Sequence, residues 1–468
     1  MMDQQNASTE HEYGLSRRRF LSAAGVGAAG MALGCRTLGS MREHAGKRKP
    51  NVIVIFSDDH GYGSMSCMPN WNIPTPNIDS IAANGVRFTD GYVTCPICGP
   101  SRAGLLTGRY QQRFGFEENS GPIPKAPANY GLPLDEKTLA DYMKELGYVT
   151  GMVGKWHLGL KPEYHPQKRG FDEFFGFLHG AHSYIDAGFQ TDNPILRGTE
   201  RVDEKAYLTD AFAREAVSFI DRHQKEPFFL YVPFNAVHSP NEAPGRFKGK
   251  FPNLQPPVLR TWAGMLAAMD EAVGKILDKV RETGLEEETL IFFLGDNGGV
   301  LVGGVEANYP LRGRKAEMYE GGIRIPFLVQ WKGHLPNNTL YEKPASSLDI
   351  LPTAVALAGG KPASNTEGVN LLPYLTGENT GTPHERLFWR WFEKSAARVG
   401  DWKLVREGDG SQQLFNLSTD LGETTDLSAS RPDKLKEIQD AYDEWNARNV
   451  APKWRDSRRK TGQEYLGI

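Results

Sequence analysis

The sequence lacks an excess of charge of one sign, a hydrophobic run long enough to cross a bilayer, and a rich supply of cysteine. Its 468 residues carry a net charge of −3 at pH 7, which argues against the strongly basic surface of a nucleic-acid-binding protein. We therefore expect no nucleic-acid partner. A weakly apolar, Ala/Gly-rich stretch at residues 20–34 is shorter than the ~20 residues of a membrane-spanning helix. An anionic substrate would have to be bound by a local group of cations rather than by the field of the whole protein.

The four cysteines are Cys35, Cys67, Cys95 and Cys98. Cys95 and Cys98 form a C-x-x-C pair, which occurs in redox motifs and in zinc sites. The sequence has no second such pair and no two histidines at zinc spacing, so we favour neither interpretation. An even number of cysteines in an exported protein also permits disulfides. Two of the four, Cys35 and Cys98, lie in sequence motifs that favour roles other than disulfide formation.

The N-terminal segment has the pattern of an export signal. Ser-Arg-Arg-Arg-Phe-Leu at residues 16–21 precedes an Ala/Gly-rich run, which gives a charged region, an apolar region and a processing site. The paired arginines resemble a twin-arginine signal, and a disordered basic tail is the alternative. Ala-Leu-Gly-Cys at residues 32–35 resembles a lipoprotein cleavage box, so Cys35 is a candidate lipid anchor. We expect residues 1–49 to be signal and linker, and the protein to be exported, either periplasmic or tethered to a membrane.

Strand and helix patterns alternate after residue 50. Apolar runs at 51–56, 148–153, 228–232 and 290–294 predict buried strands, and helical patterns occupy 138–146, 207–223 and 261–283. This alternation predicts an α/β fold with a large, mostly parallel central sheet flanked by helices. Short strand patterns at 386–391, 396–399, 403–406 and 413–416, followed by a helix at 432–448, predict a smaller C-terminal antiparallel sheet plus a helix. The expected domains are a catalytic domain at 50–365 and a C-terminal subdomain at 366–468.

Polar residues follow each of the four predicted strands of the central sheet. They are Asp58 and Asp59, Lys155 and His157, His238, and Asp296 and Asn297. In open α/β sheets ligands bind at the carboxyl ends of the strands. A single Asp in such a place is more often a helix cap, but four placements together predict a site at this edge.

Asp58, Asp59, Asp296 and Asn297 offer only oxygen ligands, which suit Ca²⁺ or Mg²⁺ rather than zinc. Carboxylates packed together would repel one another without a cation. The alternative is that they are solvated turn residues, because Asp-Asn-Gly-Gly at 296–299 is also a good turn sequence. We predict a metal site.

The segment at residues 98–109 carries the most specific signal. It reads C-x-P-S-R followed by A-x-L-x-T-G-R. Pro100 suits the first turn of a helix, which puts Cys98 at a helix N-terminus, where an anion is favoured. The segment resembles the signature of type I sulfatases, which belong to the alkaline phosphatase superfamily. Further similar segments are G-K-W-H-L-G at 154–159, G-D-N-G at 295–298, L-R-G-R-K at 311–315, E-G-G-I-R-I-P at 320–326 and L-F-N-L at 414–417.

The resemblance covers residues 51–446 and implies an alkaline-phosphatase-like fold and hydrolysis of sulfate esters. It implies that a formylglycine-generating enzyme oxidises Cys98 to formylglycine, and that the bound cation is Ca²⁺ rather than Mg²⁺. Residues 169–176 are similar to carbohydrate-active members, so the implied substrate is a sulfated saccharide.

The resemblance also implies roles for individual residues. A hydroxyl of the hydrated aldehyde attacks sulfur, and sulfate leaves as the aldehyde reforms. Arg102 holds the diol, and Lys155 and Lys315 bind sulfate oxygens. His157 takes the proton from the second hydroxyl, and His238, with Lys315, protonates the leaving alcohol.

Two other functions remain open on the sequence. One is a phosphonate or phosphodiester hydrolase of the same superfamily, some of which also use formylglycine. The other is a non-catalytic lipoprotein that binds sulfated glycans. Ser183, within residues 179–186, is a further candidate contact for the sulfate.

Overall fold

The computed structural model describes residues 48–68, 73–121, 127, 129–189 and 192–455, which belong to one unit beginning at Arg48. The predicted export signal and the candidate lipid anchor Cys35 lie outside the described residues. Within the described part of the chain, no helix has both the length and the apolar composition needed to cross a membrane.

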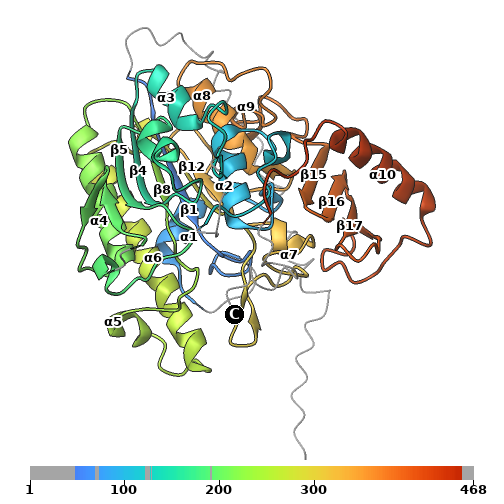
Figure 1. Ribbon diagram of the computed structural model, residues 1–468, viewed down its shortest axis with the longest axis horizontal. Coiled ribbons are helices and arrows are strands. Elements are labelled where there is room, and N and C mark those ends of the chain that lie inside the picture. Colours follow the sequence, from blue (N-terminus) through green and yellow to red (C-terminus); the bar gives the residue numbers. More distant parts are fainter. Residues whose placement is uncertain (1–47, 69–72, 122–126, 128, 190–191, 456–468) are drawn as a thin grey trace, which may run out of the picture. The chain divides into compact units, whose positions relative to one another are not determined.

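A ten-stranded sheet forms the centre of the protein (Figure 1). Its strands, in spatial order, are β13 (Thr339–Tyr341), β2 (Val86–Phe88), β12 (Phe327–Gln330), β9 (Thr289–Gly295), β1 (Asn51–Ser57), β8 (Phe228–Pro233), β4 (Val149–Lys155), β5 (Glu173–Phe177), β6 (Ile195–Arg197) and β7 (Glu200–Val202). The five central strands, from β9 to β5, are parallel. Towards the edges, β12 and β6 pair antiparallel with both of their neighbours. The sheet is therefore mixed, with a parallel centre.

The two faces of the sheet are covered by different helices, which explains the unbroken apolar runs of its central strands. Ile53 and Ile55 of β1 pack into a core with α1 (Pro76–Ala83), α4 (Leu208–His223) and α6 (Pro257–Glu282). Val52 and Val54 pack on the other face with α2 (Cys98–Thr107), α3 (Leu139–Glu145) and α8 (Ile350–Leu357). Successive side chains of a strand point to opposite faces, so a strand buried on both sides has no polar position.

A separate four-stranded antiparallel sheet lies beside the central sheet (Figure 1). Its strands are β15 (Arg386–Trp391), β16 (Lys394–Val399), β17 (Trp402–Arg406) and β18 (Gln413–Asn416). The helix α10 (Pro432–Asn446) packs on one of its faces. The other face packs against residues that neighbour Cys98 and Lys315 in the chain. The predicted fold class, an α/β protein with a C-terminal antiparallel sheet and helix, is confirmed, whereas the domain boundary at residue 365 stays a prediction.

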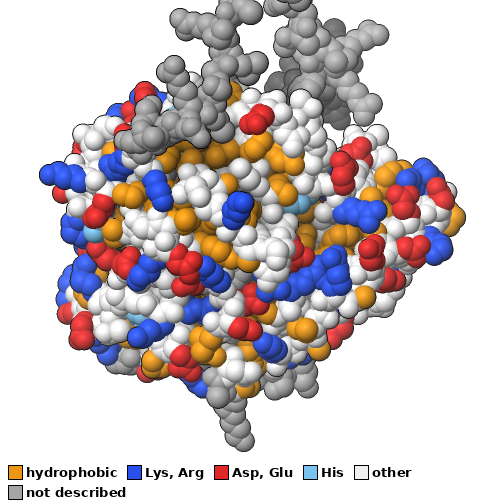
Figure 2. Space-filling model, turned by 90° about the horizontal axis from the view of Figure 1, so that it is seen from above, with side chains coloured by type: hydrophobic (Ala, Val, Ile, Leu, Met, Phe, Trp, Pro, Cys, Tyr) orange, Lys and Arg blue, Asp and Glu red, His pale blue; other side chains and the backbone are white. Residues whose placement is uncertain are grey.

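The fold also has shorter strands and α-helices. They are β3 (Gly91–Tyr92), β10 (Leu301–Val302), β11 (Val305–Glu306), β14 (Ala345–Ser346), α5 (Gly245–Lys248), α7 (Glu320–Ile323) and α9 (Leu372–Leu375). On the face of the molecule in Figure 2, acidic and basic side chains are interspersed. That pattern suits a protein whose anion attraction comes from buried cations.

Candidate active site

The ten predicted site residues come from segments far apart in the chain, and several meet at the carboxyl edge of the parallel strands. Asp58 and Asp59 follow β1, Asp296 and Asn297 follow β9, and Lys155 is the last residue of β4. All ten except His238, whose side chain is 15% exposed, are buried. Such burial of so many charged groups requires that they be paired.

Part of this set forms a group that could hold a metal ion. Ligand atoms of Asp58, Asp59, Cys98 and His238 all lie within 4.8 Å of one another. Asn297 donates from Nδ2 to Asp59 Oδ1 at 2.8 Å. Its buried Oδ1 accepts no hydrogen bond from any described residue. A buried amide oxygen without a partner, next to carboxylates, fits a hard cation.

Asp296 lies next to this group but is held by protein contacts. Its Oδ2 accepts a 2.7 Å bond from Arg102, and its Oδ1 accepts from the backbone N–H of Asp59 at 3.2 Å. The role of Asp296 as a direct ligand therefore stays a prediction, as do the roles of the other three.

Three buried cations face the three carboxylates. Lys155 contacts Asp58, Lys315 lies 2.8 Å from Asp59, and Arg102 bonds Asp296. When all three carboxyl groups are ionised these charges balance, so a divalent cation would leave the site positive. The arrangement is suited to an anionic substrate.

The crowding shifts the pKa values of two neighbouring carboxyl groups in opposite directions. Burial would raise the pKa of Asp58, but the charges of Lys155 and other cations outweigh it and hold the pKa well below its usual range. Burial and the charge of Asp58 raise the pKa of Asp296 to about 7. Opposite shifts of this kind arise when packed carboxyl groups cannot all ionise easily, and a cation would relieve that repulsion.

Cys98 is the first residue of α2, as its motif predicts. Its Sγ lies 3.5 Å from Asp58 Oδ1, and the next N–H, that of Gly99, donates to Asn119 Oδ1 at 2.8 Å. Burial raises the pKa of the Cys98 thiol to about 12. The thiol is therefore protonated at neutral pH, and an unmodified Cys98 is a poor nucleophile.

The two histidines have different surroundings. His238 Nδ1 lies 2.6 Å from the carbonyl oxygen of Ser239 and must be the donor there, which leaves Nε2 facing Asp59 Oδ2 at 3.7 Å. Burial and the charge of Lys315 lower the pKa of His238.

His157 is held in the left-handed region, with φ of 61°. Its ring lies against Gly180, where an added Cβ would be only 2.5 Å from Nε2. Burial and the charge of Lys155 place its pKa well below the ordinary value. The imidazole is neutral and can accept a proton, and the low pKa makes it a weak base in the free protein.

Some contacts were not foreseen from the sequence. The hydroxyl of Tyr184 lies 2.7 Å from the His238 carbonyl oxygen, and Asn308 bonds both the N–H and the C=O of Gly299, beside the predicted metal ligands. Asn119 likewise bonds the N–H next to Cys98. Single polar residues in loops carry no periodic signal, so spacing could not have identified them. Ser183 is within 2.7 Å of Glu242 Oε2, and its predicted contact with sulfate stays a prediction.

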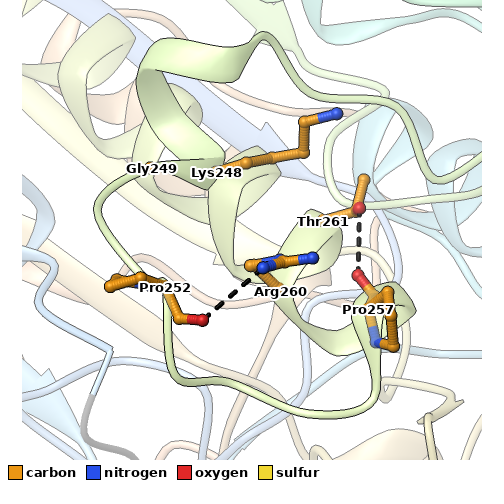
Figure 3. Close-up of a pocket in the computed structure, with 6 residues that line it drawn as sticks. All are labelled: Lys248, Gly249, Pro252, Pro257, Arg260 and Thr261. Atoms are coloured by element: carbon orange, nitrogen blue, oxygen red, sulfur yellow. Dashed lines mark hydrogen bonds between the residues drawn. The ribbon is translucent and has the colours of Figure 1, made fainter.

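A surface hollow lies between α5 and the start of α6. It is lined by Lys248, Gly249, Pro252, Pro257, Arg260 and Thr261 (Figure 3). None of the ten predicted site residues lines this hollow. Arg260 reaches across it towards the carbonyl oxygen of Pro252, at 3.5 Å.

Comparison with known proteins agrees with this geometry. The family model described as Sulfatase matches residues 50–360, and the model described as N-sulphoglucosamine sulphohydrolase, C-terminal, matches residues 314–460. The chain is 36% identical to arylsulfatase A of Homo sapiens over 412 residues, covering 81% of the chain and 77% of that protein. It is 33% identical to N-acetylgalactosamine-6-sulfatase of Canis lupus familiaris over 406 residues, covering 82% and 74%.

Among solved structures, the crystal structure of Ps i-CgsB in complex with k-i-k-neocarrahexaose superposes with a TM-score of 0.82 at 35% identity. The match covers 90% of this chain and 98% of that one.

The fold and the site define a hydrolase of the alkaline phosphatase superfamily, with carboxylates and cations at the carboxyl edge of a parallel sheet. Within that superfamily, the chain belongs to the type I sulfatase family, and it is an enzyme that hydrolyses sulfate esters. The family resemblance and the activity class predicted from the sequence are confirmed.

Proposed function

We propose that this sulfatase removes sulfate from a sulfated saccharide, using formylglycine at position 98 and one Ca²⁺. The observation that carries the proposal is the position of Cys98. It heads a helix, faces Asp58 at 3.5 Å, and has a thiol too basic to ionise near neutral pH. A residue so placed is suited to nucleophilic attack only after conversion to another group.

Asp58, Asp59, Asp296 and Asn297 would hold the cation. When bound, the cation would supply charge stabilisation to the nucleophile and to a sulfate oxygen. The proposal favours Ca²⁺ because Ca²⁺ accepts a cage built largely of protein oxygens, whereas Mg²⁺ usually keeps several waters. Formylglycine would supply an oxygen nucleophile in place of the thiol, and a formylglycine-generating enzyme is the implied partner in maturation.

Side chains of the protein would bind the sulfate, position the carboxylates and transfer protons. Lys155 and Lys315 neutralise the sulfate oxygens as point charges. Arg102, paired with Asp296, keeps the carboxylates beside residue 98 in place. The neutral His157 accepts a proton during sulfate release.

His238 donates a proton to the leaving oxygen from Nε2, the nitrogen that faces the site. Its low pKa in the free protein opposes this role. An incoming sulfate anion would raise that pKa, because a nearby negative charge favours the imidazolium.

Two relatives support a saccharide as the substrate. Ps i-CgsB is seen in complex with a neocarrahexaose, and another relative is named an N-acetylgalactosamine-6-sulfatase. Testing the purified protein against a panel of sulfated oligosaccharides would identify the sugar. Desulfation of at least one saccharide is expected, whereas turnover of aryl sulfates alone would contradict the saccharide assignment.

Parallel assays with a sulfate monoester, a phosphate monoester and a phosphonate ester distinguish the proposed sulfatase from the alternative, a phosphonate or phosphodiester hydrolase of the same superfamily. We expect kcat/KM to be highest for the sulfate ester. A higher value for the phosphonate would favour the phosphonate hydrolase, and no turnover with retained glycan binding would favour the non-catalytic lipoprotein.

We further propose that the protein is exported and is either periplasmic or tethered through lipid at Cys35. Cell fractionation of the wild type and of Cys35→Ala tests both parts. Release of the variant alone from the membrane fraction supports tethering, and a purely cytoplasmic wild type contradicts export.

A further inference from the structure

The segment that carries Lys315 lies between the residues leading to Cys98 and the C-terminal sheet. One hydrophobic cluster joins these three parts of the chain. It contains Tyr92, Cys95 and Ile97 from the first part, Ala316, Met318 and Ile323 from the second, and Leu387, Trp389, Trp391, Ala396, Val405 and Phe415 from the sheet. In Figure 1, α7, which follows Lys315, lies next to β16 and β17. The C-terminal sheet therefore packs against the residues that precede Cys98 and the residues that follow Lys315.

Ala316, the residue after Lys315, has a backbone conformation that alanine rarely adopts. Its φ is 69°, in the left-handed region that favours glycine. Such a conformation persists only where the surroundings hold it. Two hydrogen bonds do so from opposite sides: the Ala316 N–H donates to the Pro96 carbonyl at 2.9 Å, and the Ala316 carbonyl accepts from Lys394 Nζ at 2.9 Å.

Lys394 is itself fixed by a carboxylate of the same sheet. Its Nζ lies 2.7 Å from Glu407 Oε2, and Glu407 Oε1 accepts the backbone N–H of Met318. Lys394 begins β16, and Glu407 follows β17 directly. This pair thus binds the backbone on both sides of Glu317 and holds the turn after Lys315.

Lys315 directly precedes this held turn and is itself bound through its backbone and its ammonium. The Lys315 N–H donates to the Gly299 carbonyl at 3.2 Å, and its Nζ reaches the Asp59 carboxylate. A change of φ at Ala316 would alter the direction of the chain next to Lys315 and move this ammonium.

We propose that Lys394, supported by Glu407, is a positioning residue for the reaction: it acts through the Ala316 backbone to set the place of Lys315. The inference rests on the proposed function, in which Lys315 binds the sulfate. The rival view is that the Lys394–Glu407 pair only joins the C-terminal sheet to the rest of the protein. Such a joint would contribute stability and leave sulfate affinity unchanged.

Lys394→Met tests the proposal, because methionine keeps an apolar stem beside Trp391 while removing the ammonium that lies 5.6 Å from that ring centre. Lys436→Met is the matched control, since Lys436 is an exposed residue of α10 paired with Asp440. The measurements are kcat and KM for nitrophenyl sulfate, the Kd for inorganic sulfate from thermal shifts, and Tm.

We expect Lys394→Met to lower kcat/KM by ~10-fold, because a misplacement of about 1 Å in a catalytic group can cost up to ~10²-fold. The Kd for sulfate should rise in parallel, and Tm should stay within ~3 °C of the wild type. Lys394→Arg should recover most of the loss, and Lys436→Met should match the wild type. Glu407→Gln, which keeps an acceptor for Met318, should shift sulfate affinity in the same direction by less.

A double-mutant cycle with Lys315→Ala tests whether Lys394 affects sulfate binding through Lys315. If Lys394 acts through Lys315, Lys394→Met causes no further rise in the sulfate Kd in the Lys315→Ala background. Additive rises in the sulfate Kd of the double mutant would overturn the proposal. A fall in Tm with unchanged sulfate affinity in both Lys394→Met and Glu407→Gln would also overturn it. If the wild type turned over no sulfate ester, the proposed function would fail, and the sulfate Kd cycle would still report whether Lys394 and Lys315 are coupled.

Discussion

The ammonium of Lys315 lies 2.8 Å from the carboxylate of Asp59, although the two residues are 256 positions apart in the chain. Asp59 follows the central strand β1, whereas Lys315 belongs to a long connection after β9. Burial disfavours the charge of Lys315, but Asp59 and other negative groups outweigh it and raise the pKa of Lys315 above its ordinary value. Lys315 is therefore a permanent cation at the point where the sulfate is expected.

Removal of the bound cation should lower both activity and stability. A cation that binds only the folded protein stabilises it by mass action, and here it would also relieve repulsion between buried carboxylates. Differential scanning fluorimetry and rate measurements before and after treatment with a strong chelator check this. Restoration by Ca²⁺ is expected, and indifference of both Tm and rate to the chelator would contradict the metal site.

Asp296→Asn should weaken cation binding and reduce turnover while preserving the shape of the site. The substitution removes a charge that also pairs with Arg102 at 2.7 Å, so some loss of Tm is expected too. Calorimetric titration of the cation into the stripped protein gives the affinity. Asp349→Asn, another buried carboxylate variant, is the control for nonspecific destabilisation and should leave the cation Kd unchanged.

His238→Ala should affect substrates according to their leaving group. A sugar alcohol leaves poorly without a proton, and help from a general acid typically contributes ~10²–10⁴-fold. A nitrophenolate leaves without a proton, so its kcat/KM should fall much less. Equal losses on a sulfated sugar and on nitrophenyl sulfate would make His238 a sulfate-binding residue and shift the acid role to Lys315.

The stability of the protein should depend on the protonation of His384. Burial opposes its charge, but the carboxylate of Asp349, 2.8 Å away, outweighs burial and raises the pKa of His384 above the ordinary value of 6.5. The resulting stabilisation is complete below the unfolded pKa, about 6.5, and is lost as the pH rises through the higher folded value. Chemical denaturation from pH 6 to 9 should show a decline in unfolding free energy that is smaller in His384→Asn. Parallel profiles in both proteins would contradict this ion pair.

The sequence was sufficient for the elements whose patterns are local. β1, β4, β8 and β9 appear within two residues of their predicted bounds, because strands covered on both faces are continuous apolar runs. α3 begins one residue after its predicted start, at Leu139, because Thr138 is the N-cap and forms a capping box with Asp141. The antiparallel edges formed by β12 and β6 were not foreseen, since short strands paired across long connections leave no periodic signal.

For the site, the rule that ligands bind at the carboxyl ends of parallel strands correctly predicted that Asp58 and Asp296 lie close together. Lys315 was reached only through the family resemblance, because a lone lysine in a loop has no pattern of its own. The two contacts of the next residue, Ala316, with Lys394 Nζ and with the Pro96 carbonyl were beyond sequence reasoning, because tertiary packing brings these backbone groups to their partners.

Cys98→Ala should abolish turnover and leave the fold intact. Cys98 heads α2, and the hydrogen bond from its Sγ to Asp58 Oδ1 is long, at 3.5 Å, so the loss of this one sulfur atom removes the nucleophile and little stabilisation. The Tm of the variant should lie within ~3 °C of the wild type. A variant that retained wild-type turnover would show that residue 98 is not the nucleophile.

The most direct test of the central claim is the mass of the peptide containing residue 98, measured in the same preparations whose sulfatase activity is assayed. Preparations made with and without a co-expressed formylglycine-generating enzyme would differ in the converted fraction. The account predicts that kcat per enzyme molecule rises in proportion to that fraction and vanishes where Cys98 is wholly unmodified. Full sulfatase activity in a preparation that contains only unmodified Cys98 would contradict it.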